Sequence, residues 1–184
     1  MKMVRCKVCG FLMPEGSHHD KCPACGVSSK MFEPYTDPVG EARRRWLKLD
    51  LHPMAVHLPT SFCVAVLVFA FAGLFFTADA HSLLWSTTKI IATVFPLVMA
   101  IAIVLGLLDG AKRFRRIFNS AILKRKIVYG SSLFVISVAL AVIVWMDSTP
   151  FQIAAVVLAA GGLVFVILLA LLGTSINNAA MPGK

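Results

Sequence analysis

The stretch RCKVCGFLMPEGSHHDKCPACG, residues 5–26, contains two Cys-x-x-Cys-Gly motifs separated by a polar segment rich in turn-forming residues. Each motif places two thiols on a tight turn, and the following glycine, Gly10 or Gly26, supplies the unusual backbone conformation there. Two such turns facing each other present four sulfur atoms tetrahedrally, which suits zinc or iron. We therefore predict a metal site formed by Cys6, Cys9, Cys22 and Cys25.

The rest of the chain is strongly apolar. Of its 184 residues, 58% are hydrophobic and only 15% are charged, against roughly 25% charged residues in an average soluble domain. The formal net charge of +9 would be compatible with nucleic-acid binding. However, the basic residues gather at the ends of apolar segments, as they do beside a membrane. We expect the membrane, and no nucleic acid, to be a partner.

Four apolar segments each approach the roughly 20 residues that a helix needs to cross a bilayer. They cover about residues 54–77, 88–108, 127–146 and 151–172. In lipid only helices and closed barrels satisfy every backbone amide, so we predict an all-α membrane domain, a bundle of four transmembrane helices. The predicted domains are a small metal-bound knuckle domain at 1–37, a basic juxtamembrane linker at 38–51, the transmembrane domain at 52–176 and a tail at 177–184.

The distribution of basic residues predicts the orientation of the bundle. Seven Lys and Arg residues lie between the second and third segments, and four more lie at 43–48, whereas the two opposite loops contain none before Lys89. By the positive-inside rule, the N- and C-termini are cytoplasmic. Tryptophan is common at membrane boundaries, so we expect Trp46 at the inner boundary and Trp85 and Trp145 at the outer one. We also expect Cys63, inside the first segment, to pack as a small hydrophobic residue.

The N-terminal segment resembles the rubredoxin-like domain at the end of rubrerythrins. The resemblance is carried by C-x-x-C-G-aromatic at Cys6 to Phe11, C-P-x-C-G at Cys22 to Gly26, and Phe32-Glu33. It covers about residues 3–35 and implies one iron ion on the four cysteines, used for one-electron transfer. The rest of the chain does not resemble the carboxylate-rich di-iron domain of rubrerythrins, so peroxidase activity of that type is not implied.

The run LHPMAVHLP at residues 51–59 opens the membrane domain. Together with Gly106, Leu107 and Asp109, it resembles an uncharacterised family of four-span bacterial membrane proteins with an H-P-x-x-V-H-x-P motif. Histidines and acids inside a membrane are costly and often functional. We predict His52, His57 and Asp109 as cofactor-binding residues, for a quinone head group or haem b; the alternative is that they only fix the bundle. His52 and His57 would point about 140 degrees apart on a regular helix, so they would not hold one ion together.

Two hypotheses of different classes follow. The favoured one is an integral membrane electron-transfer protein in the inner (cytoplasmic) membrane of a bacterium or archaeon, with a soluble redox partner and with further membrane subunits or a second copy as candidate partners. Such a chain is an electron carrier or oxidoreductase subunit more than a stand-alone enzyme, and no catalytic residue is assigned. The alternative is a zinc-ribbon scaffold or assembly subunit without redox activity, because zinc does not change oxidation state.

Overall fold

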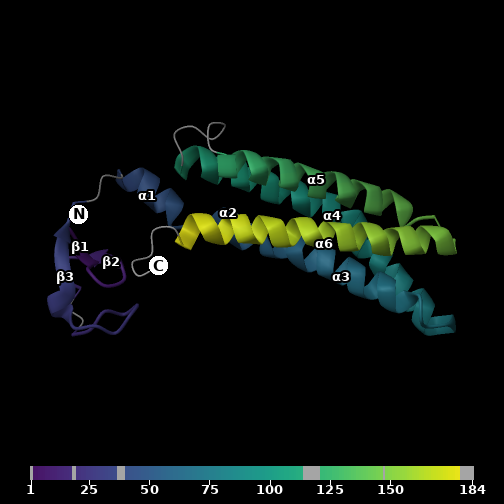
Figure 1. The fold of residues 1–184 in the computed structure, drawn as a ribbon, viewed down its shortest axis with the longest axis horizontal. Coiled ribbons are helices and arrows are strands. Elements are labelled where there is room, and N and C mark those ends of the chain that lie inside the picture. Colours follow the sequence, from purple (N-terminus) through teal and green to yellow (C-terminus); the bar gives the residue numbers. More distant parts are fainter. Residues whose placement is uncertain (1, 18–19, 37–39, 114–120, 147, 179–184) are drawn as a thin grey trace. The chain divides into compact units, whose positions relative to one another are not determined.

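The computed structural model describes residues 2–17, 20–36, 40–113, 121–146 and 148–178, without the side chains of Ala78 and of residues 175–178. The chain divides into two compact units, one of Met1–Arg45 with Gly173–Lys184 and one of Trp46–Leu172. Figure 1 labels the helices and strands of both units. Residues 114–120, which hold Arg115 and Arg116 of the predicted basic loop, lie outside the described residues.

The N-terminal unit contains a small antiparallel sheet. Its strands are β1 (Met3–Cys6), β2 (Leu12–Pro14) and β3 (Phe32–Tyr35), in the order β2-β1-β3, and a short 3-10 helix, η1 (Ser29–Met31), precedes β3. Met3 and Cys6 at the two ends of β1 are buried, and because they are three residues apart they lie on opposite faces of the strand. The strand register pairs Cys6 with Phe32. The sheet thus connects the first cysteine motif to the segment that follows the second.

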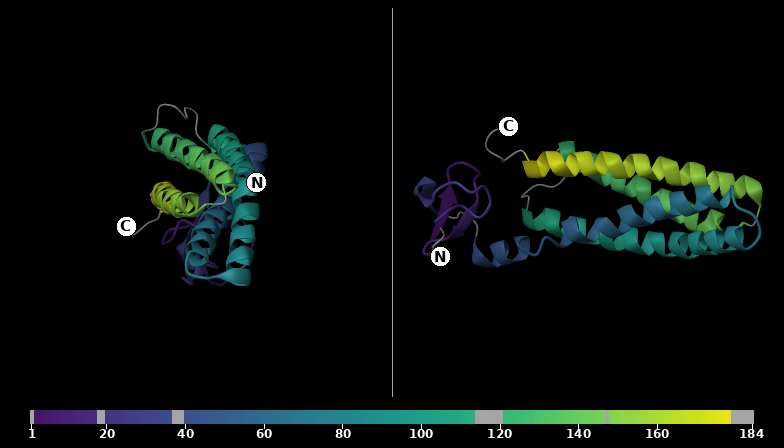
Figure 2. Two further views of the ribbon diagram at one scale, coloured as in Figure 1. Left: turned by 90° about the vertical axis from the view of Figure 1, so that its right-hand side faces the viewer. Right: turned by 90° about the horizontal axis from the view of Figure 1, so that it is seen from below.

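In the described part of the chain, six α-helices follow the sheet. They are α1 (Glu41–Leu47), α2 (Leu51–Ala55), α3 (His57–Gly73), α4 (Ala78–Arg113), α5 (Ala121–Ile143) and α6 (Thr149–Asn178). Four stretches of these helices are long and apolar enough to cross a membrane: Glu41–Gly73, Asp79–Arg113, Ala121–Ile143 and Thr149–Thr174. The long helices run side by side in the two views of Figure 2. The prediction of four membrane-spanning segments is confirmed.

Small residues allow the bundle helices to pack closely. Cys63 of α3 is fully buried, and its thiol donates to the Ala159 carbonyl of α6 at 3.7 Å. A β-carbon at Gly162, one turn further along α6, would lie 3.3 Å from the Cys63 sulfur and 3.3 Å from Leu133 of α5. The expectation that Cys63 packs as a small hydrophobic residue is confirmed, and α3, α5 and α6 meet around it.

Proline affects the first span but does not end the second. The first span is interrupted at Val56, between α2 and α3, three residues before Pro59. Proline lacks an amide hydrogen and its ring conflicts with the carbonyl four residues earlier, which here belongs to Ala55. The α4 helix, in contrast, continues through Pro96.

The expectation for Trp85 was wrong. Its side chain is only 5% exposed and belongs to the bundle core, so it does not face a membrane boundary. The reason is that α4 begins at Ala78, ten residues before the predicted segment, and Trp85 therefore lies two turns inside a packed helix. Trp145 is 60% exposed, and its indole nitrogen donates to the Thr93 hydroxyl at 3.0 Å.

Candidate metal centre

The two cysteine motifs fold into matching turns. In each, the amide of the glycine after the second cysteine donates to the carbonyl of the first: Gly10 to Cys6 and Gly26 to Cys22, both at 2.8 Å. The φ angles of Gly10 and Gly26 are 74° and 75°, in the left-handed region that side chains with a β-carbon rarely adopt. The sequence prediction that both glycines serve the turns is therefore confirmed by the backbone.

A second pair of matching hydrogen bonds closes the turns. The Cys6 amide donates to the Phe11 carbonyl at 2.9 Å, and the Cys22 amide donates to the Val27 carbonyl at 2.7 Å. Each first cysteine is thus held at both its amide and its carbonyl. The backbone of each first cysteine is therefore held in place by its own turn.

The four sulfur atoms come together. The Sγ atoms of Cys6, Cys9, Cys22 and Cys25 all lie within 4.8 Å of one another. The Sγ atoms of Cys6 and Cys25 are 3.8 Å apart, and those of Cys9 and Cys22 are 3.7 Å apart. Metal–sulfur bonds of about 2.3 Å around a tetrahedral ion give sulfur–sulfur separations of about 3.8 Å. The donor set therefore fits a tetrahedral iron or zinc ion.

The four sulfurs differ in their surroundings. Cys6 and Cys22 are buried, Cys9 is half-buried and Cys25 is exposed. A hydrogen bond from the Cys9 amide lowers the pKa of Cys6 to about 7. The Phe11 amide also lowers the pKa of Cys9, but desolvation and the neighbouring cysteine sulfurs outweigh it and raise that pKa to about 12. Four thiolates so close together need a cation between them, and a bound metal ion supplies it.

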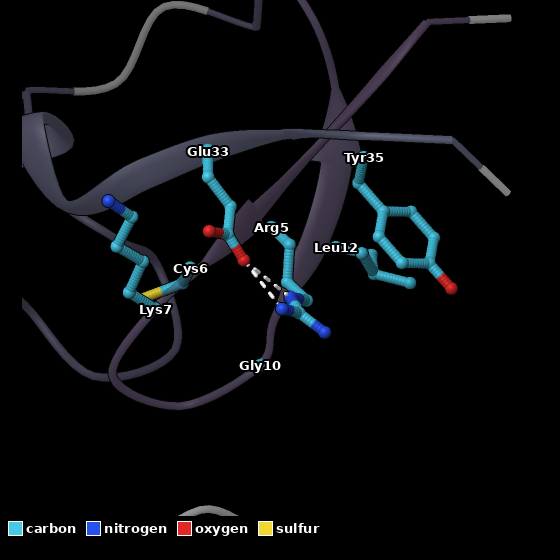
Figure 3. Close-up of a pocket in the computed structure, with 7 residues that line it drawn as sticks. All are labelled: Arg5, Cys6, Lys7, Gly10, Leu12, Glu33 and Tyr35. Carbon is cyan, nitrogen blue, oxygen red and sulfur yellow. Dashed lines mark hydrogen bonds and ion pairs between the residues drawn. The ribbon is translucent and has the colours of Figure 1, made fainter.

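A charged pocket lies beside the cysteine turns. Its lining includes Arg5, Cys6, Lys7, Glu33 and Tyr35, and its volume is about 430 Å³ (Figure 3). Arg5 donates to Glu33 Oε1 through Nη2 at 2.6 Å and through Nε at 3.0 Å. The Arg5 guanidinium carbon also lies 5.7 Å from the centre of the Tyr35 ring. Glu33, which the sequence analysis noted only as part of Phe32-Glu33, therefore links β3 to β1 next to Cys6, a predicted metal ligand.

A comparison with protein families agrees with this geometry. Residues 5–33 match the model of the family described as the rubrerythrin rubredoxin-like domain. The N-terminal domain is rubredoxin-like. The matched range of the rubredoxin-like domain includes both cysteine turns and ends at Glu33, the partner of Arg5. No curated protein and no solved structure matches the chain.

Of the three predicted cofactor-binding residues of the membrane unit, the structure places His52 near Asp109 and leaves the His57 side chain exposed. The His52 imidazole is half-buried, with Nδ1 3.2 Å from the Ala102 carbonyl oxygen of α4. His57 lies beyond the break at Val56 with an exposed side chain. Among the described residues, no hydrogen bond or ion pair of the His57 imidazole is found. Asp109 lies on α4 and accepts from Arg113 Nε at 3.3 Å.

Two neighbours of this region were missed by the sequence analysis. Arg113 also donates to Asp50 Oδ1 at 3.4 Å, which links α4 to the residue that precedes α2. Lys126 of α5 interacts electrostatically with Asp109, Arg113 and His52. The sequence analysis had used Arg113 and Lys126 only as members of the group of basic residues that predicts the membrane orientation. A signal was present, because Asp109 and Arg113 have the i, i+4 spacing of a helical ion pair.

Proposed function

We propose that this protein is an integral membrane electron-transfer protein whose rubredoxin-like domain binds one iron ion. The observation that carries the proposal is the set of four cysteine sulfurs within 4.8 Å of one another, inside the range that matches the rubredoxin-like family. Iron on four thiolates supplies one-electron transfer when it is bound. The four apolar helices would keep this centre at a membrane surface.

The polypeptide contributes the environment of the metal ion. Amides of Val8 and Cys9 donate to the Cys6 sulfur, the Phe11 amide donates to Cys9, and the Val27 amide donates to Cys25. Hydrogen bonds to ligand sulfurs and solvent exposure set the reduction potential of iron–thiolate centres. The exposed ligand, Cys25, is the sulfur at which a soluble partner could approach within electron-transfer distance.

The finer parts of the proposal concern location and the membrane partner. The basic residues at 43–48 and 112–126 support a cytoplasmic position for both termini, in the inner membrane of a bacterium or archaeon. We further propose a quinone or haem b site in the membrane unit that uses His52 and Asp109. His57 enters this proposal with less support from the structure, because its side chain is exposed on a separate helix.

The proposal is tested by metal content and redox titration of the full chain in lipid nanodiscs. We expect one iron ion per chain. Its redox titration should follow a one-electron Nernst curve, with a slope of about 59 mV per tenfold change in the ratio of oxidised to reduced protein. Stoichiometric zinc and the absence of any titrating centre would favour the zinc-ribbon scaffold and would reject electron transfer. The variant Cys63→Ser serves as a matched control, because Cys63 lies in the membrane unit and should not alter either result.

A further inference from the structure

The structure assigns His52, Gly106 and Asp109 to a binding site for the hydroxyl-bearing head group of a quinol. This inference rests on the proposed function and adds to it the chemical class and the redox form of the membrane partner. It is carried by the contacts around the His52 ring and by the polar face of α4 that the ring meets.

Gly106 provides the space in which the His52 ring lies. A β-carbon at position 106 would come within 2.8 Å of Cε1 and 2.9 Å of Nδ1 of His52, closer than real β-carbons approach their neighbours. Any other residue there would displace the ring, so the glycine fixes where the imidazole can lie. The first residue of the G-L-x-D pattern is therefore a glycine because the His52 ring occupies the space of a β-carbon.

The hydrogen bond to Ala102 fixes which ring nitrogen is free. A carbonyl oxygen can only accept, so Nδ1 of His52 carries the hydrogen in its 3.2 Å contact with the Ala102 oxygen. A neutral imidazole that donates through Nδ1 has an unprotonated Nε2. Among the described residues no hydrogen bond to this Nε2 is found, and its lone pair is the one with which a ligand that brings a donor would pair.

Asp109 adds a second acceptor on the same face of α4. Ala102, Gly106, Asp109 and Arg113 follow one another at helical spacings of four, three and four residues, so they form one stripe. Arg113 occupies Oδ2 of Asp109 and also reaches Asp50, while Lys126 approaches from α5. The side chain of Asp109 is 14% exposed, and no hydrogen bond to its other oxygen is found among the described residues.

Two acceptors, His52 at the beginning of the first apolar span and Asp109 near the end of the second, select for a membrane ligand with hydroxyl donors. A quinol has two hydroxyl groups and an apolar tail, whereas the oxidised quinone has only carbonyl acceptors and would pair poorly with Nε2. Within the described residues, the four cysteines form the one group of metal-binding side chains found, so a divalent ion is not indicated here. A haem with two axial histidines would need a second ligand opposite His52, and His57 is exposed on a different helix.

The test is calorimetric titration of the full-length protein in phosphatidylcholine nanodiscs with a short-chain benzoquinol, in its reduced and oxidised forms. We expect the quinol to bind about tenfold more tightly than the quinone, the effect of one hydrogen bond in a protein site. His52→Ala and Gly106→Ala should each weaken quinol binding roughly five- to tenfold. Gly161→Ala should leave it within about twofold, because an added β-carbon at Gly161 would meet nothing within 4 Å.

Each other outcome overturns the inference. These outcomes are no saturable binding, equal affinity for both redox forms, or an equal loss in Gly161→Ala. A haem absorption band that depends on His52 would also overturn it, as would loss of quinol binding when phosphatidylglycerol, a hydroxyl-bearing lipid, replaces phosphatidylcholine. Nε2 chemical shifts of ¹⁵N-labelled histidine report the same contact without reference to the metal. An iron protein that binds no quinol rejects this inference alone, whereas a zinc protein that binds quinol rejects the proposed function alone.

Discussion

The sulfur atoms of Cys9 and Cys22 lie 3.7 Å apart although the two residues belong to different turns. This contact makes the metal site a link between two separate parts of the sequence. We predict that Cys22→Ser abolishes stoichiometric metal binding, whereas Cys63→Ser retains one metal ion per chain. Elemental analysis of both purified proteins provides the measurement, and a Cys22→Ser protein with one bound metal would show that the four-cysteine site is wrong.

Removal of the metal should unfold the small domain and leave the membrane helices intact. The sheet consists of strands of three or four residues, too few to bury a core that offsets the entropy of folding. We expect amide hydrogen exchange in β1 and β3 to become fast after chelation, while α3 to α6 remain protected. Unchanged protection of β1 in the metal-free protein would contradict the view that the metal ion stabilises this fold.

Gly26→Ala should weaken metal binding through backbone strain. The φ angle of Gly26 is 75° and nothing lies within 4 Å of an added β-carbon, so strain is the whole effect. Placing a residue with a β-carbon in this conformation costs about 1–2 kcal/mol of free energy, which corresponds to a roughly 5- to 30-fold lower affinity for the metal ion. Competition with a chelator measures this affinity. Gly40→Ala is the control, because Gly40 also has open space and lacks the positive φ; equal affinities of the two variants would refute the prediction.

The cluster of four cysteines could be predicted from the sequence because each cysteine pair depends on short-range structure. Each Cys-x-x-Cys-Gly motif determines its own turn, and the structure brings both turns together as expected. The apolar segments could also be predicted from the sequence, since length and composition alone identify a helix that could span a membrane. The three-stranded sheet was not predicted, because strands of three or four residues carry too little periodicity to recognise.

The details of the membrane unit depend on contacts between distant residues. A regular helix through 51–59 ignores the break at Val56, which puts His52 and His57 on separate helices. Nothing in the local sequence shows that the His52 ring would lie against Gly106, more than fifty residues away. Trp85 was misplaced for a related reason: the polar residues before it suggested a loop, but α4 includes them.

Asp109→Asn should lower thermal stability more than Asp50→Asn. Asp109 has a side chain that is only 14% exposed and interacts with Arg113 and Lys126, so its removal leaves two positive charges less well compensated. Asp50 is 61% exposed, and an ion pair at such a position contributes at most about 1 kcal/mol. We expect a loss of about 1–3 kcal/mol for Asp109→Asn, measured by thermal unfolding in detergent. Equal effects would show that this charge cluster has no special role.

The predicted orientation can be tested by cysteine labelling in intact cells. Ser148 is exposed between α5 and α6 and should face outward, whereas Leu49 is exposed beside the basic residues at 43–48 and should face inward. In a Cys63→Ser background, a membrane-impermeant thiol reagent should label Ser148→Cys and leave Leu49→Cys unmodified until the cells are opened. Mass spectrometry of the labelled peptides separates these sites from the metal-binding cysteines. The reverse pattern would place both termini outside.

The central claim is that the four-cysteine centre holds iron and changes its oxidation state. The most direct measurement is the visible absorption spectrum of the full-length protein, purified from membranes without chelators, before and after chemical reduction, together with its metal content. The account predicts a red oxidised protein with one iron ion per chain and thiolate-to-iron bands that disappear on reduction. A colourless protein with one zinc ion per chain and no spectral change would contradict it.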